Sequence, residues 1–137
     1  MRKIIVIISL SAIVLVLVGG TIACKSSPSS TPEESAIRAY ADPATETTLQ
    51  GLSENNLAKY TQYANSEFKA AVTQEILDKA ATQINNQLGT YASKEFLRIG
   101  EQDGYTIVHY KAKYTKGEAG IRMVFDKDHL VAGQWFE

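Results

Sequence analysis

The residue with the most clearly defined chemistry is Cys24, the only cysteine of the 137-residue chain. It follows a basic start at Arg2 and Lys3 and an apolar run from Ile4 to Val18, a combination typical of a secretory signal peptide. A single cysteine excludes a disulfide within the chain, and a free thiol on an exported protein would be open to oxidation. We therefore expect the thiol of Cys24 to be modified.

The stretch Thr21-Ile22-Ala23-Cys24 resembles the bacterial lipobox, although Thr21 stands where leucine is usual. The resemblance implies that residues 1–23 are removed as a signal peptide. It also implies that Cys24 receives a diacylglycerol, which makes membrane lipid the first expected partner. The alternative is a single N-terminal transmembrane anchor, because residues 4–23 are about the 20 residues that a helix needs to cross a bilayer. In both cases the basic start favours the cytoplasmic side, so the rest of the chain is expected on the extracytoplasmic face of the cell membrane.

The two histidines, His109 and His129, have no cysteine or carboxylate at metal-ligand spacing around them, so we expect no metal and no cofactor. His109 shares one face of a predicted strand with Lys111 and Lys113, which is more typical of a solvated surface than of a catalytic site. The sequence also contains no nucleophile elbow and no phosphate-binding glycine loop. We therefore assign no catalytic residue from the sequence.

Five aromatic residues are candidates for the lining of a binding pocket: Tyr60, Tyr63, Tyr110, Tyr114 and Trp135. Aromatic side chains with a few polar groups are typical of small-molecule sites. The alternative is that these residues fill the edge of the core, with their polar ends reaching water. Both interpretations remain open at this stage.

Charge and length restrict the class of protein. Removal of residues 1–23 takes away two basic residues and leaves 12 basic against 15 acidic side chains, a net charge near −3. A nucleic-acid-binding surface needs clustered basic residues, and no such cluster follows the signal, so this class is excluded. Residues 24–34 are polar and contain two prolines, which predicts a flexible tether after the lipidated cysteine. Residues 35–137 then suffice for one small domain.

Helical periodicity dominates the first part of this domain. Asp42-Pro43 predicts a helix boundary or a kink at Pro43. An apolar stripe over residues 57–72 predicts a second helical segment, with a possible break near Asn65-Ser66. The clearest helix is expected from Thr73 to Gly89. On this last helix, the residues expected to pack on the sheet recur every four positions: Ile76, Ala80, Ile84 and Leu88.

After Tyr91 the apolar period changes to two, and turn signals follow at Asp103-Gly104, Lys116-Gly117 and residues 126–128. Four strands are predicted, over residues 94–102, 105–115, 118–125 and 130–136. Short turns predict an antiparallel meander. The predicted class is α+β, with N-terminal helices packed on one face of a four-stranded antiparallel sheet, because neither layer can bury its apolar face alone.

Several segments resemble the DUF3887 family of small extracytoplasmic modules. The features that carry the resemblance are Gln87-Leu88-Gly89, the strand Tyr105 to Tyr114, the segment Ile121 to Asp126, and Leu130-Val131-Ala132-Gly133. The resemblance implies a cone-shaped fold of the NTF2-like or cystatin-like kind, in which helices and a curved sheet often enclose an apolar pocket. It brings no catalytic signature.

The expected function is that of a lipid-anchored, extracytoplasmic, non-catalytic module that binds a small apolar ligand or an envelope or protein partner. One alternative is a small NTF2-like enzyme, and another is a structural spacer on the envelope. An Asp or Glu inside the cone beside a tyrosine would favour the enzyme, because catalysis by a general base needs a carboxylate in an apolar site.

Overall fold

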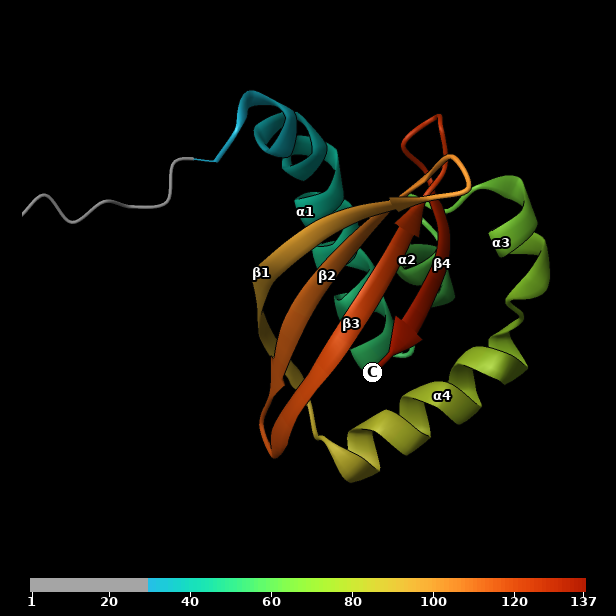
Figure 1. Ribbon diagram of the computed structural model, residues 1–137. Coiled ribbons are helices and arrows are strands. Elements are labelled where there is room, and N and C mark those ends of the chain that lie inside the picture. The colour runs from blue at the N-terminus through green and yellow to red at the C-terminus, as the bar shows by residue number, and fades with distance from the viewer. Residues whose placement is uncertain (1–29) are drawn as a thin grey trace, which may run out of the picture.

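The computed structural model describes residues 30–137, so Cys24 and the predicted signal peptide lie outside the described residues. Four helices precede four strands along the chain (Figure 1): α1 Pro32–Ser53, α2 Leu57–Tyr60, α3 Ser66–Ala71, α4 Gln74–Gln87, β1 Tyr91–Gln102, β2 Tyr105–Tyr114, β3 Gly117–Phe125 and β4 Val131–Phe136. The strands pair antiparallel in the order β1-β2-β3-β4. The predicted α+β class and the predicted meander are both confirmed.

The turns between the strands follow from local chemistry. Asp103 and Gly104 have φ values of 54° and 80°, the left-handed conformation that an Asp-Gly hairpin turn needs. In the last turn, Oδ1 of Asp126 accepts hydrogen bonds from the backbone N–H of Asp128 at 2.9 Å and of Leu130 at 3.0 Å. These turns place the strand boundaries within three residues of the predicted positions.

Helix α1 is longer than predicted and continuous. It begins at Pro32, inside the segment predicted as tether, where Oγ1 of Thr31 accepts a hydrogen bond from the N–H of Glu34 at 3.1 Å. It then passes through Pro43, so the boundary predicted there is wrong. Proline removes one helical N–H and typically costs about 3 kcal/mol inside a helix. Burial of Ala41 and Ala44 on either side, and of the residues that follow, offsets this cost.

The main hydrophobic core lies between α1 and one face of the sheet, and Figure 1 shows α1 crossing behind the strands. Alternation along β2 and β3 points every second side chain into this layer. Its buried members are Ala41, Ala44, Leu49, Val108, Tyr110, Ala112, Tyr114, Ile121, Met123, Phe125 and Val131. The residues of β2 in this layer, Val108, Tyr110, Ala112 and Tyr114, lie on the face opposite to the predicted polar face of His109, Lys111 and Lys113.

Helix α4 packs mainly against other helices. Leu77 and Ala81 form a second buried cluster with Leu52 of α1, and Figure 1 shows α4 running along the lower end of the fold. Ile76 is 50% exposed, so the prediction that it packs on the sheet is wrong. The buried positions, Leu77 and Ala81, each follow a predicted position by one residue, because the helix packs against α1 and α2. Only the last turns of α4 approach the main core, through Ile84 and Leu88.

The opposite face of the sheet carries no helix within residues 30–137, as the front of Figure 1 shows. Lys111 and Lys113 on this face are exposed, as predicted for the polar side of β2. No helix of the described part of the chain is long and apolar enough to span a membrane.

Candidate functional site

The five aromatic residues predicted to line a pocket do not gather around one cavity. Tyr110 and Tyr114 are buried in the core layer, whereas Trp135 is 47% exposed and pairs with Arg122 on the opposite face of the sheet. The hydroxyl of Tyr60 donates a hydrogen bond to Oε1 of Gln134 at 2.9 Å, and Tyr63 is exposed. Among the residues on strands, alternation separates Tyr110 and Tyr114 from Trp135, because successive side chains of a strand point to opposite faces of the sheet.

The interior contains a tyrosine–carboxylate pair that the sequence analysis did not assign. The hydroxyl of Tyr110 donates to Oδ1 of Asp42 at 2.8 Å, and Arg38 donates to Oδ2 of the same carboxylate at 3.0 and 3.1 Å. The guanidinium of Arg38 also lies 4.4 Å from the ring centre of Phe96. This group of contacts joins α1 to β1 and β2.

A second pair lies one helical turn further along α1. The hydroxyl of Tyr91 donates to Oε2 of Glu46 at 2.7 Å, and Nζ of Lys94 lies 3.4 Å from the same oxygen. Gln50 donates to Oε1 of Glu46 at 2.9 Å. The sequence feature that could have indicated both pairs is the i, i+4 spacing of Arg38, Asp42 and Glu46, which places these charges on one side of the helix.

Burial keeps these tyrosines protonated. Desolvation, followed by the hydrogen bond to Asp42, raises the pKa of Tyr110 far above its ordinary value, and the same causes with Glu46 raise the pKa of Tyr91. Burial alone raises the pKa of Tyr60 and of Tyr114 to about 12. The hydroxyl groups of Tyr60, Tyr91 and Tyr110 therefore act as hydrogen-bond donors. All four oxygens of Asp42 and Glu46 accept hydrogen bonds from side chains.

The two histidines occupy different environments. His109 lies on the polar face of β2 as predicted, but it is only 8% exposed, because neighbouring side chains cover it. Its Nδ1 is 3.1 Å from Oε2 of Glu137 and 3.5 Å from Nη2 of Arg98. His129 is exposed, has a φ of 62°, and stacks on the ring of Tyr40 at 4.1 Å. No group of three or more metal-ligating side chains occurs in residues 30–137.

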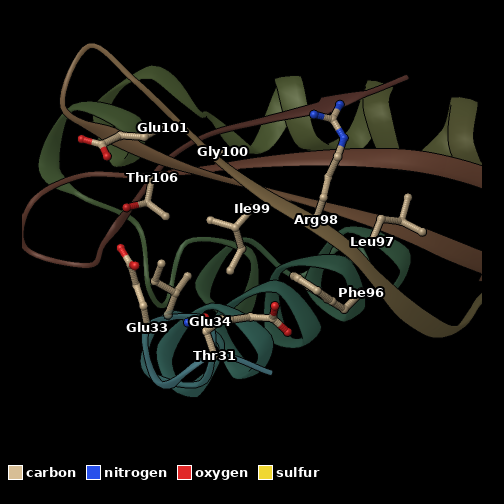
Figure 2. A pocket seen from close by; sticks show the side chains of 11 residues that line it. Thr31, Glu33, Glu34, Phe96, Leu97, Arg98, Ile99, Gly100, Glu101 and Thr106 are labelled. Carbon is tan, nitrogen blue, oxygen red and sulfur yellow. Dashed lines mark hydrogen bonds between the residues drawn. The ribbon is translucent and has the colours of Figure 1, made fainter. Parts of the chain in front are cut away.

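An open cleft of about 530 Å³ lies between the start of α1 and β1, and Figure 2 shows it from close by. Its apolar floor consists of Ile37, Phe96 and Ile99, which pack against the main core. Figure 2 shows Phe96 and Ile99 turned toward α1, whereas Arg98 turns away from it. The cleft thus reaches the apolar interior at the edge of the sheet.

The mouth of the cleft is acidic. Glu33 and Glu34 line it from α1, and Glu101 lines it from β1. Arg98 also belongs to the lining, although its side chain turns away from α1 (Figure 2), and Glu34 lies 3.9 Å from Arg38. The hydroxyl groups of Thr31 and Thr106 also line the cleft and add hydrogen-bonding capacity. An apolar floor below carboxylates suits a molecule with an apolar body and a cationic or hydrogen-bond-donating end. Sequence patterns could not reveal this cleft, because its two walls are about 60 residues apart in the chain.

Comparisons with known proteins agree with the observed fold. Residues 45–133 match the family described as "Protein of unknown function (DUF3887)". A solved structure, "NMR structure of protein from Ruminococcus gnavus ATCC 29149", is similar with a TM-score of 0.50 and 13% identity, over 74% of this chain and 89% of that chain. This likeness supports the fold alone. No curated protein matches the chain. Because the family match extends over more than half of the sequence, the chain belongs to the DUF3887 family.

Proposed function

We propose that this protein is a non-catalytic binding module, held by a lipid on Cys24 at the extracytoplasmic face of the cell membrane, whose ligand site is the cleft between α1 and β1. The observation that carries the proposal is the cleft itself, with an apolar floor of Ile37, Phe96 and Ile99 and an acidic mouth. Its volume of about 530 Å³ is within the range of small-molecule sites. The ligand class that fits is an amphipathic molecule with an amine.

The contacts of the Asp42–Tyr110 pair also have a role in holding the fold together. Asp42 accepts from Arg38 and Tyr110 together, and the tyrosine hydroxyl is held inside the core. A general base must reach the proton of a bound substrate within hydrogen-bonding distance. In this arrangement the oxygens of Asp42 are used to hold α1 on the sheet.

A small enzyme is the second candidate, and the observation that favours it is a carboxylate beside a buried tyrosine, Asp42 with Tyr110. Binding experiments with small amphipathic probes such as phenethylamine also test this alternative. Chemical conversion of a bound probe, lost in Asp42→Asn, would favour the enzyme over the binding module.

The cleft predicts selectivity for charge. We expect phenethylamine to bind more tightly than phenethyl alcohol, because the two differ in the ammonium group that the carboxylates at the mouth attract. Amide chemical-shift changes in ¹⁵N-labelled residues 30–137 should concentrate on the first turns of α1 and on residues 96–101. The double variant Glu33→Gln, Glu101→Gln should weaken the amine by about threefold to tenfold, as expected for exposed charge pairs.

The matched control for these variants is Glu75→Gln, an exposed glutamate on α4 far from the cleft that pairs with Lys79. It should leave the affinity for phenethylamine unchanged. Shift changes scattered over the surface, or equal affinities for the amine and the alcohol, would contradict the proposed site.

The lipid anchor predicts the behaviour of Cys24→Ala. Each buried methylene contributes about 0.8 kcal/mol to membrane binding, and stable attachment takes more than one acyl chain. We expect the variant to lose incorporation of a radiolabelled fatty acid and to remain as a precursor of lower mobility on a gel. Ser26→Ala is the matched control and should be labelled like the wild type. Unchanged labelling of Cys24→Ala would exclude this cysteine as the attachment site.

A further inference from the structure

A row of four side chains crosses the uncovered face of the sheet. Arg98 of β1 is paired with His109 of β2, His109 with Arg122 of β3, and Arg122 with Trp135 of β4. Directly paired residues of antiparallel strands point to the same face. Adjacent strands are about 4.8 Å apart, so the α-carbons of the two arginines are about 10 Å apart, with the histidine between them. We call these four residues the arginine row.

The two arginines of the row lack carboxylate partners within residues 30–137. The ion pairs of the described chain include neither Arg98 nor Arg122, and the one carboxylate that joins the row, Glu137, lies against His109. The Nε atom of Arg122 is buried and finds no hydrogen-bond acceptor among the described residues. A buried donor without an acceptor is unfavourable, and it is rare in folded proteins. Arg122 therefore retains hydrogen-bonding capacity that the described residues do not use.

The neighbours of Arg122 hold it in place. Its guanidinium lies 4.7 Å from the ring centre of Trp135, a cation–π contact. The indole in turn lies against Gly133, where a methyl group would overlap the ring. The absence of a side chain at position 133 thus allows the indole to lie flat on β4. The guanidinium is thereby presented in a restricted orientation, which lowers the entropy lost when an anion binds.

A shallow hollow of about 150 Å³ adjoins the row. Tyr105, Ile107 and Val124 give it apolar walls, Arg122 lies at one side, and Gln102 and Asp103 complete the rim. A cavity of this size can hold a benzene ring. The face therefore combines an apolar hollow with the guanidinium groups of Arg122 and Arg98. Carboxylates predominate instead at the cleft between α1 and β1, which Arg98 also lines.

We propose that the uncovered face of the sheet binds a small amphipathic carboxylate, with its apolar or aromatic group in the hollow beside Tyr105 and its carboxylate on Arg122 and Arg98. A guanidinium matches a carboxylate through two parallel hydrogen bonds. The acidic groups nearby, Glu137 and Asp103, disfavour a doubly charged phosphate, so a single negative charge fits best. The proposed cleft ligand carries the opposite charge, and the two proposed sites share only Arg98.

The experiment uses the emission of Trp135, the only tryptophan of the chain, in the full-length protein in neutral-detergent micelles at neutral pH. The probe is N-acetyl-phenylalanine, and the control is N-acetyl-phenylalaninamide, which has the same ring and no carboxylate. We expect a saturable change of emission with the acid, and an affinity at least about tenfold lower with the amide, the loss expected for a charge-assisted hydrogen-bonded pair.

Variants locate the site. Arg122→Gln and Arg98→Gln should each weaken binding of the acid by about tenfold or more, while circular dichroism confirms that the variants are folded. Arg98 is exposed, so its variant still tests the site if Arg122→Gln fails to fold. Lys111→Gln is the matched control, because Lys111 lies on the same face and pairs with Glu118. Equal affinities for acid and amide, no saturable change, or wild-type affinity in Arg98→Gln and Arg122→Gln would each overturn the proposal.

Discussion

Alkaline titration is expected to unfold this domain steeply above pH about 10, because its buried tyrosines lose their protons far more easily in the unfolded chain. Burial raises the pKa of Tyr114 to about 12, and burial with the Asp42 contact raises the pKa of Tyr110 further. Each such tyrosine lowers the free energy of unfolding by about 1.4 kcal/mol per pH unit. Two of them over about two units remove about 5 kcal/mol, a large part of the stability of a small domain.

The sign follows from the order of proton loss. Below pH about 10 both states keep their tyrosine protons, and the shifted pKa values have no effect on stability. Between about 10 and the pKa of the folded state, the unfolded chain has already released protons that the folded state retains, so rising pH favours unfolding. Urea unfolding followed by circular dichroism at a series of pH values measures this slope, and phenolate absorbance should rise together with unfolding.

Tyr110 and Tyr114 supply a matched pair of variants. The hydroxyl of Tyr114 is buried without a hydrogen-bond partner among the described residues, so Tyr114→Phe should keep or raise the stability at neutral pH by about 1 kcal/mol. Tyr110→Phe removes the donor to Asp42 and should cost about 1 kcal/mol. Both should reduce the alkaline slope. An unchanged slope in Tyr114→Phe would show that this tyrosine reaches water in the folded state.

The strands could be predicted because their signals are local. Period-two patterning and the turn at Asp103-Gly104 each need only a few adjacent residues, and the positive φ values at that turn leave few alternatives. The boundary predicted at Pro43 failed for the opposite reason. A proline breaks an isolated helix, but in α1 the burial of Ala41, Ala44 and later residues outweighs the lost hydrogen bond, and this burial depends on strands more than 50 residues away.

The candidate sites could be predicted less well, because each depends on how distant segments meet. Trp135 was grouped with Tyr114 by residue type, yet strand parity places the two on opposite faces of the sheet. The cleft depends on α1 reaching the edge of β1, and the arginine row depends on the register of four strands. Residue types alone identify candidate site residues, whereas strand pairing and register decide which of these residues lie next to one another.

The charges of the two surfaces differ in a way that composition hides. The net charge of the predicted mature chain is near −3, and this number alone indicates a mildly acidic surface with no preferred location for either charge. The structure separates much of this charge, with Glu33, Glu34 and Glu101 at the cleft and Arg122 on the far side of the sheet. Arg98 belongs to both, because it lines the cleft and is also paired with His109 in the arginine row. The two proposed sites therefore differ in charge, and at physiological ionic strength exposed charges more than about 8 Å apart are largely screened from one another.

Truncation of Leu77 to alanine is expected to destabilise the domain by about 2 to 5 kcal/mol, the usual cost of removing a buried leucine side chain. Leu77 is 1% exposed and packs with Leu52 and Ala81 between α4 and α1, so its loss leaves a cavity that rigid helices cannot fill. The adjacent Ile76, 50% exposed, is the matched control, and Ile76→Ala should change the free energy of unfolding by less than about 0.5 kcal/mol. Denaturant unfolding of both variants measures the difference. Equal effects, or a larger effect at Ile76, would mean that α4 turns its other face inward and rests on the sheet.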